Sequence, residues 1–111
     1  LVAFEFAGSS DVNLALNAGK VTTRMEGAVK LTLSGQAGVH NITTQGVAAV
    51  EAFNFAAGIY ALDLTGSAKA NINVLNELNI KTEGSSEVYY KGNPKKVKEK
   101  KSRATRLEKV N

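Results

Sequence analysis

The sequence contains no cysteine and no tryptophan, and it has one proline, one histidine and only 6% aromatic residues. Without cysteine, disulfide bonds, thiolate catalysis and Cys-ligated metal sites are excluded. The single histidine, His40, and the lack of tryptophan leave little material for a histidine-based metal site or a Trp-lined sugar platform. No run of 18 apolar residues is present, so the sequence predicts no transmembrane helix.

The net charge of +4 is unevenly distributed along the chain. Residues 95–111 hold eight basic and two acidic residues, a net +6, whereas residues 1–94 hold six basic and eight acidic residues, a net −2. Nucleic acid is not expected as a partner, because the basic tail has no interleaved aromatics and no recognisable reader fold. The tail is better interpreted as a cap, and Lys95, Lys96 and Lys98 are weak candidates for binding an anionic surface polysaccharide or lipopolysaccharide.

Glycine recurs at intervals of 19, 19, 20 and 18 residues, at Gly8, Gly27, Gly46, Gly66 and Gly84. The residues two, four and six positions before these glycines, and four and six after them, are mostly apolar and alternate with polar ones, which is typical of strands with one buried face. A second column of turn formers lies eight residues before the glycines, at Gly19, Gly38, Gly58 and Asn76. Gly and Asn tolerate positive φ, so both columns are predicted to be corners.

A repeated strand and corner unit that buries its inner face only by stacking predicts an all-β fold, a parallel β-solenoid of five to six rungs with about 19 residues in each. Residues 1–94 are expected to form these rungs, and residues 95–111 a basic terminal rung, cap or tail. Opposite charges in outward columns, such as Glu5 with Arg24 and Asp63 with Lys81, are expected on adjacent rungs. The alanine-rich stretch 46–62 could instead form a helix, but the repeat favours a strand.

The chain opens inside a strand, so we expect the natural protein to continue N-terminally. The apolar strand at residues 2–6 then has no covering rung, which predicts a homodimer through this uncapped end. At the other end, Pro94 and the lysines are expected to discourage further stacking.

The segment Glu83–Pro94 reads Glu-Gly-Ser-Ser-Glu-Val-Tyr-Tyr-Lys-Gly-Asn-Pro. It resembles the closing motif of the putative auto-transporter adhesin, head GIN domain family, which runs Gly-Ser-Gly-Asp-Ile/Val, aromatics and Gly-Asn-Pro. The resemblance covers nearly the whole chain and matches the C-terminal half of a family domain. It implies a right-handed parallel β-helix that is exported to the periplasm, outer membrane or cell surface in Bacteroides-like bacteria. It implies no catalytic residue and no cofactor. Arg103 and Thr105 depart from the family's last Gly-Ser-Gly, which leaves the path of the final rung open.

Individual candidate residues support a binding role only weakly. His40 lacks a second metal ligand and is interpreted as structural. Tyr89 is expected to face outward, where it could stack on a sugar ring. Among the carboxylates, Glu26 and Glu83 share a column but lie three rungs apart, about 14 Å. The leading hypothesis is therefore a non-enzymatic envelope protein whose partner is a surface polysaccharide or another envelope protein. The alternative is a carbohydrate-active β-helix, either a polysaccharide lyase or hydrolase or its inactive binding relative.

Overall fold

The computed structural model describes residues 2–100 and 105–110. It is all-β: within these residues the elements are β1 (Val2–Lys91), β2 (Lys96–Lys100) and β3 (Arg106–Lys109), with no helix. They form one sheet of three parallel strands in the order β2-β1-β3. The all-β prediction is confirmed, and the helical alternative for residues 46–62 is wrong because that stretch belongs to β1.

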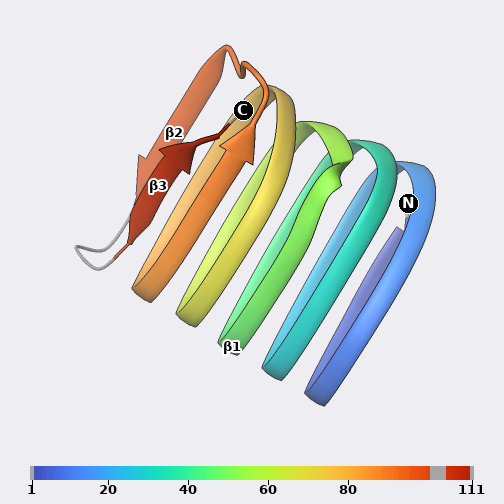
Figure 1. Ribbon diagram of the computed structural model, residues 1–111, viewed down its shortest axis with the longest axis vertical. Helices are drawn as coiled ribbons and strands as arrows, with labels where there is room; N and C mark the ends of the chain where they lie inside the picture. Colours follow the sequence, from blue (N-terminus) through green and yellow to red (C-terminus); the bar gives the residue numbers. More distant parts are fainter. Residues whose placement is uncertain (1, 101–104, 111) are drawn as a thin grey trace.

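β1 cannot be a straight ribbon. Its 90 residues would extend about 300 Å at the usual rise per residue, but the longest dimension of the molecule is 31 Å. Figure 1 shows how the length is accommodated: the strand winds into a flattened coil, and its successive turns lie side by side. Segments one repeat apart in the sequence are therefore neighbours in space.

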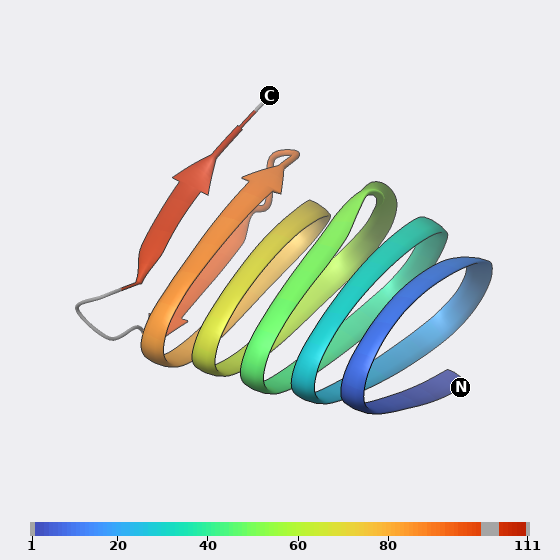
Figure 2. The same cartoon turned by 60° about the horizontal axis from the view of Figure 1, so that its bottom comes forward.

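The two short strands continue this stacking on opposite walls of the coil. β2 pairs with residues 77–81, so that Lys100 lies opposite Lys81, and β3 pairs with residues 87–90, so that Arg106 lies opposite Glu87. Figure 2 shows β3 in front and β2 behind it. We call the wall that carries residues 41–43, 61–63, 79–81 and β2 the first wall, and the wall that carries residues 51–53, 69–73, 87–91 and β3 the second wall. The partners in both pairings are 19 residues apart, so the register predicted for the last copies is confirmed.

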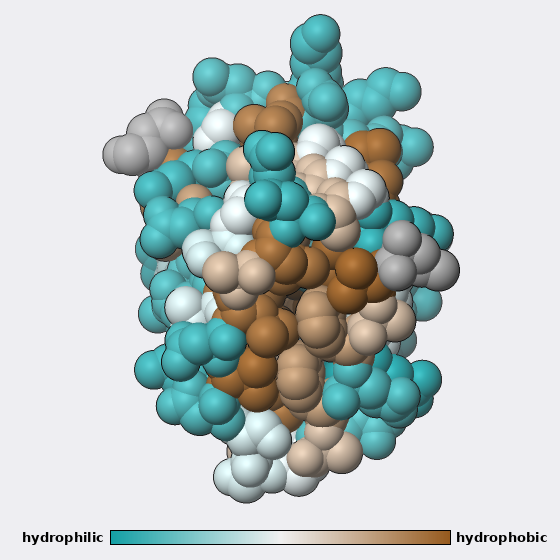
Figure 3. Space-filling model, turned by 90° about the vertical axis from the view of Figure 1, so that its right-hand side faces the viewer, coloured by the Kyte–Doolittle hydropathy of each residue, from teal (hydrophilic) through white to brown (hydrophobic). Residues whose placement is uncertain are grey.

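The core lies between the two walls and follows the alternation of the sequence. Leu31, Leu33, Ile72 and Leu78 are fully buried, whereas the residues between them in the sequence are mostly more exposed. The first turn differs, because its inward positions are only partly buried; these are Val2, Phe4, Phe6, Val12, Leu14 and Leu16. Figure 3 shows the result, a continuous hydrophobic area at the N-terminal end of the coil.

Arg24 pairs differently from the prediction. The expected partner of Arg24 is Glu5, on the neighbouring turn. Its guanidinium instead donates to Glu26 Oε1 at 2.9 Å, within the same strand segment. Arg106 pairs with Glu108 in the same way, at 2.6 Å. Residues two apart share one face of a strand, so a long arginine reaches its own neighbour without crossing to another turn. Such exposed pairs contribute little stability.

Glycine is required in the main column for two reasons, namely its backbone conformation and the lack of room for a Cβ. Gly27 has φ +95°, and a Cβ added to it would lie 2.5 Å from the backbone oxygen of Gly8 on the preceding turn. Positive φ is shared by the rest of the column, namely Gly8, Gly46, Gly66 and Gly84.

The second column has a different basis. Gly19, Gly38, Gly58 and Asn76 do not adopt positive φ, so the conformational reason expected for them is wrong. Gly38 is needed for space instead, because its Cβ would lie 2.8 Å from the Gly19 backbone oxygen. Two glycines outside both columns, Gly35 and Gly92, have positive φ.

Four glycine-to-alanine variants should separate conformation from crowding. Gly19→Ala meets neither constraint and should leave stability unchanged or raise it by up to about 1 kcal/mol. Gly8→Ala has only the positive φ and should cost about 1–2 kcal/mol. Gly38→Ala has only the close backbone contact and should cost about 1–3 kcal/mol. Gly27→Ala has both and should cost more than either.

Urea unfolding of the four variants measures these differences. Equal stability of Gly19→Ala and Gly27→Ala would contradict the close stacking of turns described for the main glycine column.

Candidate functional site

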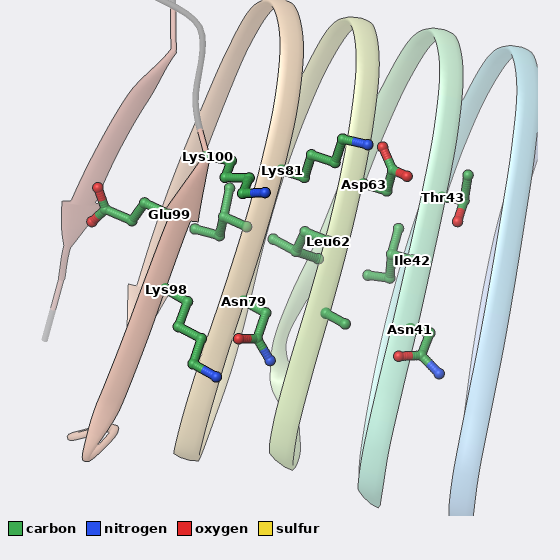
Figure 4. Close-up of a pocket in the computed structure, with 12 residues that line it drawn as sticks. Asn41, Ile42, Thr43, Leu62, Asp63, Asn79, Lys81, Lys98, Glu99 and Lys100 are labelled. Atoms are coloured by element: carbon green, nitrogen blue, oxygen red, sulfur yellow. The ribbon is translucent and has the colours of Figure 1, made fainter.

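A shallow groove of about 480 Å³ crosses four neighbouring strand segments of the first wall. Ile42, Leu62 and Ile80 lie along its middle with their side chains buried, so the strand backbone forms much of its floor. Outward side chains on either side form two rims. One rim carries Thr43, Asp63, Lys81 and Lys100, and the other carries Asn41, Ala61, Asn79 and Lys98. Figure 4 shows the labelled side chains of these two rims on either side of Leu62 and Ile42.

The groove changes character along its length. Its N-terminal end presents the neutral side chains of Asn41 and Thr43, and its C-terminal end presents Lys81, Lys98 and Lys100. Lys81 extends toward Asp63, whereas Glu99 points away from the other groove side chains (Figure 4). The C-terminal end is therefore a cluster of three exposed ammonium groups, the arrangement expected to attract an anionic ligand.

The groove does not present the paired acids of a glycoside hydrolase. These enzymes use two carboxyl groups facing one substrate bond, whereas the carboxylates among the described residues of this groove are Asp63, on one rim, and Glu99, which points away. Among residues 2–100 and 105–110, no three His, Cys, Asp or Glu side chains gather as a metal site. Among the described residues, the groove therefore shows more lysines than carboxylates and no facing carboxyl pair.

A family model described as "Putative auto-transporter adhesin, head GIN domain" matches residues 2–94. The chain belongs to this family. The resemblance expected from the closing motif at residues 83–94 is thus confirmed. No match was found among curated proteins or among solved structures. The head GIN domain match ends at Pro94, immediately before the lysines that open β2. The part of the chain that the structure describes has no helix long and apolar enough to cross a membrane.

The lysines predicted as binding candidates fall partly within this groove. Lys98 lines it, opposite Asn79 in the strand pairing, and Lys96 lies on the same strand opposite Glu77. The backbone N–H of Lys95 donates to the Asn76 carbonyl at 2.7 Å, which starts the pairing of β2. The sequence predicted Lys81 only as a partner of Asp63, and neither Lys81 nor Lys100 was named as a binding candidate. The repeat could have indicated both, since each stands three residues before a repeat position, in an outward column.

Tyr89 lies on the second wall and is partly exposed, with the ammonium of Lys69 5.8 Å from its ring centroid. The other copies of the repeat have no aromatic residue in the column of Tyr89, where they hold Asn13, Thr32, Glu51 and Asn71. In the structure Phe53 is also partly exposed on this wall, and the Lys91 ammonium lies 4.9 Å from its ring centroid. The neighbouring column therefore supplies the second aromatic.

His40 is a core residue and does not contribute to a surface site. Its side chain is fully buried, its Nε2 lies 3.0 Å from Thr23 Oγ1, and its ring contacts Phe55 and Tyr60. The Tyr60 hydroxyl donates to the Phe55 carbonyl at 2.9 Å rather than to the imidazole. Burial lowers the pKa of His40 to about 4 and raises the pKa of Tyr60 above its usual range. The imidazole is therefore neutral in the folded protein at pH 7.

The lowered pKa makes stability depend on pH. The unfolded chain protonates His40 near pH 6.5, but the folded protein does so only near pH 4. The free energy of unfolding is therefore not reduced by His40 above pH 6.5. As the pH falls from 6.5 to 4 it decreases, by roughly 3 kcal/mol in total. The double variant Thr23→Val/His40→Leu removes both partners and should reduce the loss of stability over this range by that amount. Urea unfolding at pH 7, 5.5 and 4 measures it.

Tyr60→Phe is the matched control, because it alters the same cluster and retains the imidazole. Its pH dependence should equal that of the unchanged protein. Identical acid sensitivity of the double variant would show that His40 does not lose its proton on folding.

Proposed function

We propose that this head GIN domain is a non-enzymatic binding module of the cell envelope. In this proposal the first-wall groove holds an anionic surface polysaccharide at its lysine-rich end. The observation that carries it is the presence of Lys81, Lys98 and Lys100 along the two rims of one groove, at its C-terminal end. The adhesin description of the family supports a surface or exported location and a binding role.

The architecture suits a repetitive polymer. We propose that β1, β2 and β3 form a right-handed parallel β-helix of five to six rungs, with residues 1–94 as the repeats and residues 95–111 as a basic terminal rung, cap or tail. The stacked turns of Figure 1 and the pairing at 19-residue spacing support this. Strands about 4.8 Å apart repeat the same outward positions along the coil. A polymer lying along the groove can therefore contact several turns at once. The binding free energies of these individually weak contacts then add up.

Substituting the groove lysines tests the proposal. Lys81→Gln/Lys98→Gln/Lys100→Gln should weaken binding of a polyuronate by about tenfold or more in isothermal titration. Binding should also weaken steeply as salt is raised, since exposed charges are screened within about 8–10 Å at physiological ionic strength. The matched control is Lys20→Gln/Lys30→Gln, which removes exposed lysines that do not line the groove and should bind like the unchanged protein.

Equal losses in the two variants would show that only net charge matters and would overturn the groove assignment. The titrated polymer should be recovered intact. Release of reducing or unsaturated sugar that disappears in Asp63→Asn would favour a carbohydrate-active enzyme instead.

We also infer a homodimer through the N-terminal turn when nothing else covers it. Phe4 and Phe6 are only partly buried in the first turn, and their ring centroids are 6.2 Å apart. Figure 3 shows an exposed hydrophobic area at this end of the coil. A two-fold contact between two such ends would close without building a fibre, while β2 leaves a lysine-rich edge at the other end. Light scattering of Phe4→Ser/Phe6→Ser should give a monomer where the unchanged chain gives a dimer. A monomeric unchanged chain at high concentration, or open filaments, would refute this pairing.

A further inference from the structure

The second wall carries a surface unlike the groove. Phe53 and Tyr89 are partly exposed there, on turns separated by one further turn that contributes Asn71 and Asn73. From two strand spacings and a shift of two residues, the two rings are about 12 Å apart. Large aromatic side chains that remain partly exposed are good contact surfaces, because they lose little conformational entropy on binding.

Fixed polar groups fill the space between and beside the rings. The amide of Asn71 is almost fully buried and donates to Glu51 Oε1 at 2.6 Å, and the amide of Asn73 donates to the Phe53 carbonyl at 3.4 Å. A hollow of about 450 Å³ lies on the same wall and is lined in part by Ser67, Lys69, Ser85, Glu87 and Arg106. Hydroxyls, amides and carboxylates are the groups that exchange hydrogen bonds with sugar hydroxyls.

The charge around the rings is close to balanced. The second wall carries four basic residues and three acidic ones, namely Lys69, Lys91, Arg106 and Lys109 with Glu51, Glu87 and Glu108. The first wall carries four lysines against two carboxylates, Asp63 and Glu99. A neutral ligand therefore fits this wall better than a polyanion. The lysines that lie over the two rings hold them only weakly, because an exposed cation–π contact is a small interaction, so a ligand can displace both ammonium groups.

We infer that the second wall binds a neutral oligosaccharide, which stacks sugar rings on Tyr89 and Phe53 and hydrogen-bonds to the polar groups between them. The separation of the two rings is too large for one sugar unit to contact both. Affinity should therefore rise with chain length until both rings are covered. This site is separate from the first-wall groove and does not depend on the function proposed for it.

The experiment uses the full chain with an array of neutral and uronic-acid-containing oligosaccharides of increasing length, followed by titration of the tightest neutral ligand. Tyr89→Ala and Phe53→Ala should each weaken neutral binding by about tenfold, and Tyr89→Phe should retain it because the stacking face remains. Lys69→Gln and Lys91→Gln should bind as well as the unchanged protein or better, since they uncover the rings. Leu75→Ala is the control for loss of an exposed apolar side chain, since Leu75 lines neither the first-wall groove nor the second-wall hollow, and it should have no effect.

Salt dependence separates the two walls. Neutral binding should be insensitive to salt and unaffected by Lys81→Gln/Lys98→Gln/Lys100→Gln, even if the anionic site of the first wall proves wrong. The inference is overturned if no neutral chain binds, if Tyr89→Ala binds as tightly as the unchanged protein, or if binding requires Lys69 and Lys91. Thermal unfolding of each variant identifies any loss that is caused by misfolding.

Discussion

The close stacking of one turn of backbone on the next is the constraint on which the rest of this structure depends. At the main corner a Cβ on Gly46 would lie 2.7 Å from the Gly27 oxygen, and one on Gly66 would lie 2.5 Å from the Gly46 oxygen. The turns thus meet through main-chain atoms, and the contact repeats along the coil. A shift of one residue would turn every inward side chain outward. The stacking therefore sets both the register and the composition of the core.

Such a narrow core has to balance large and small side chains within each turn. The turn between Gly46 and Gly66 is one residue longer than most, and it places Phe55 and Tyr60 in the interior beside Ala52 and Ala57. The ring of His40, on the preceding turn, fits against both aromatics. This packing leaves His40 Nδ1 buried without a hydrogen-bond partner among residues 2–100 and 105–110. Since a buried cation would be costly there, the imidazole stays neutral and serves packing.

The two walls of the coil present different chemistry because their outward columns are independent of the core. On the first wall the columns end in lysines contributed by β2, which follows the region matched by the family model. On the second wall they hold two aromatic rings and charges that are close to balanced. The two proposed sites therefore differ in the chemistry that they offer to a ligand.

The sequence by itself determined the repeat period, the inward and outward alternation, and the pairing of the last copies, such as Val88 with Leu107. These follow from local rules, since side chains alternate along a strand and stacked copies align like residues. The tertiary structure alone decided which outward groups meet. Arg24 reaches Glu26 rather than Glu5, and Phe53 shares a wall with Tyr89 although the two belong to different columns. It also decided that Gly38 is needed for space and not for its conformation. Long side chains and close backbone contacts depend on distances between turns, and a linear pattern does not contain those distances.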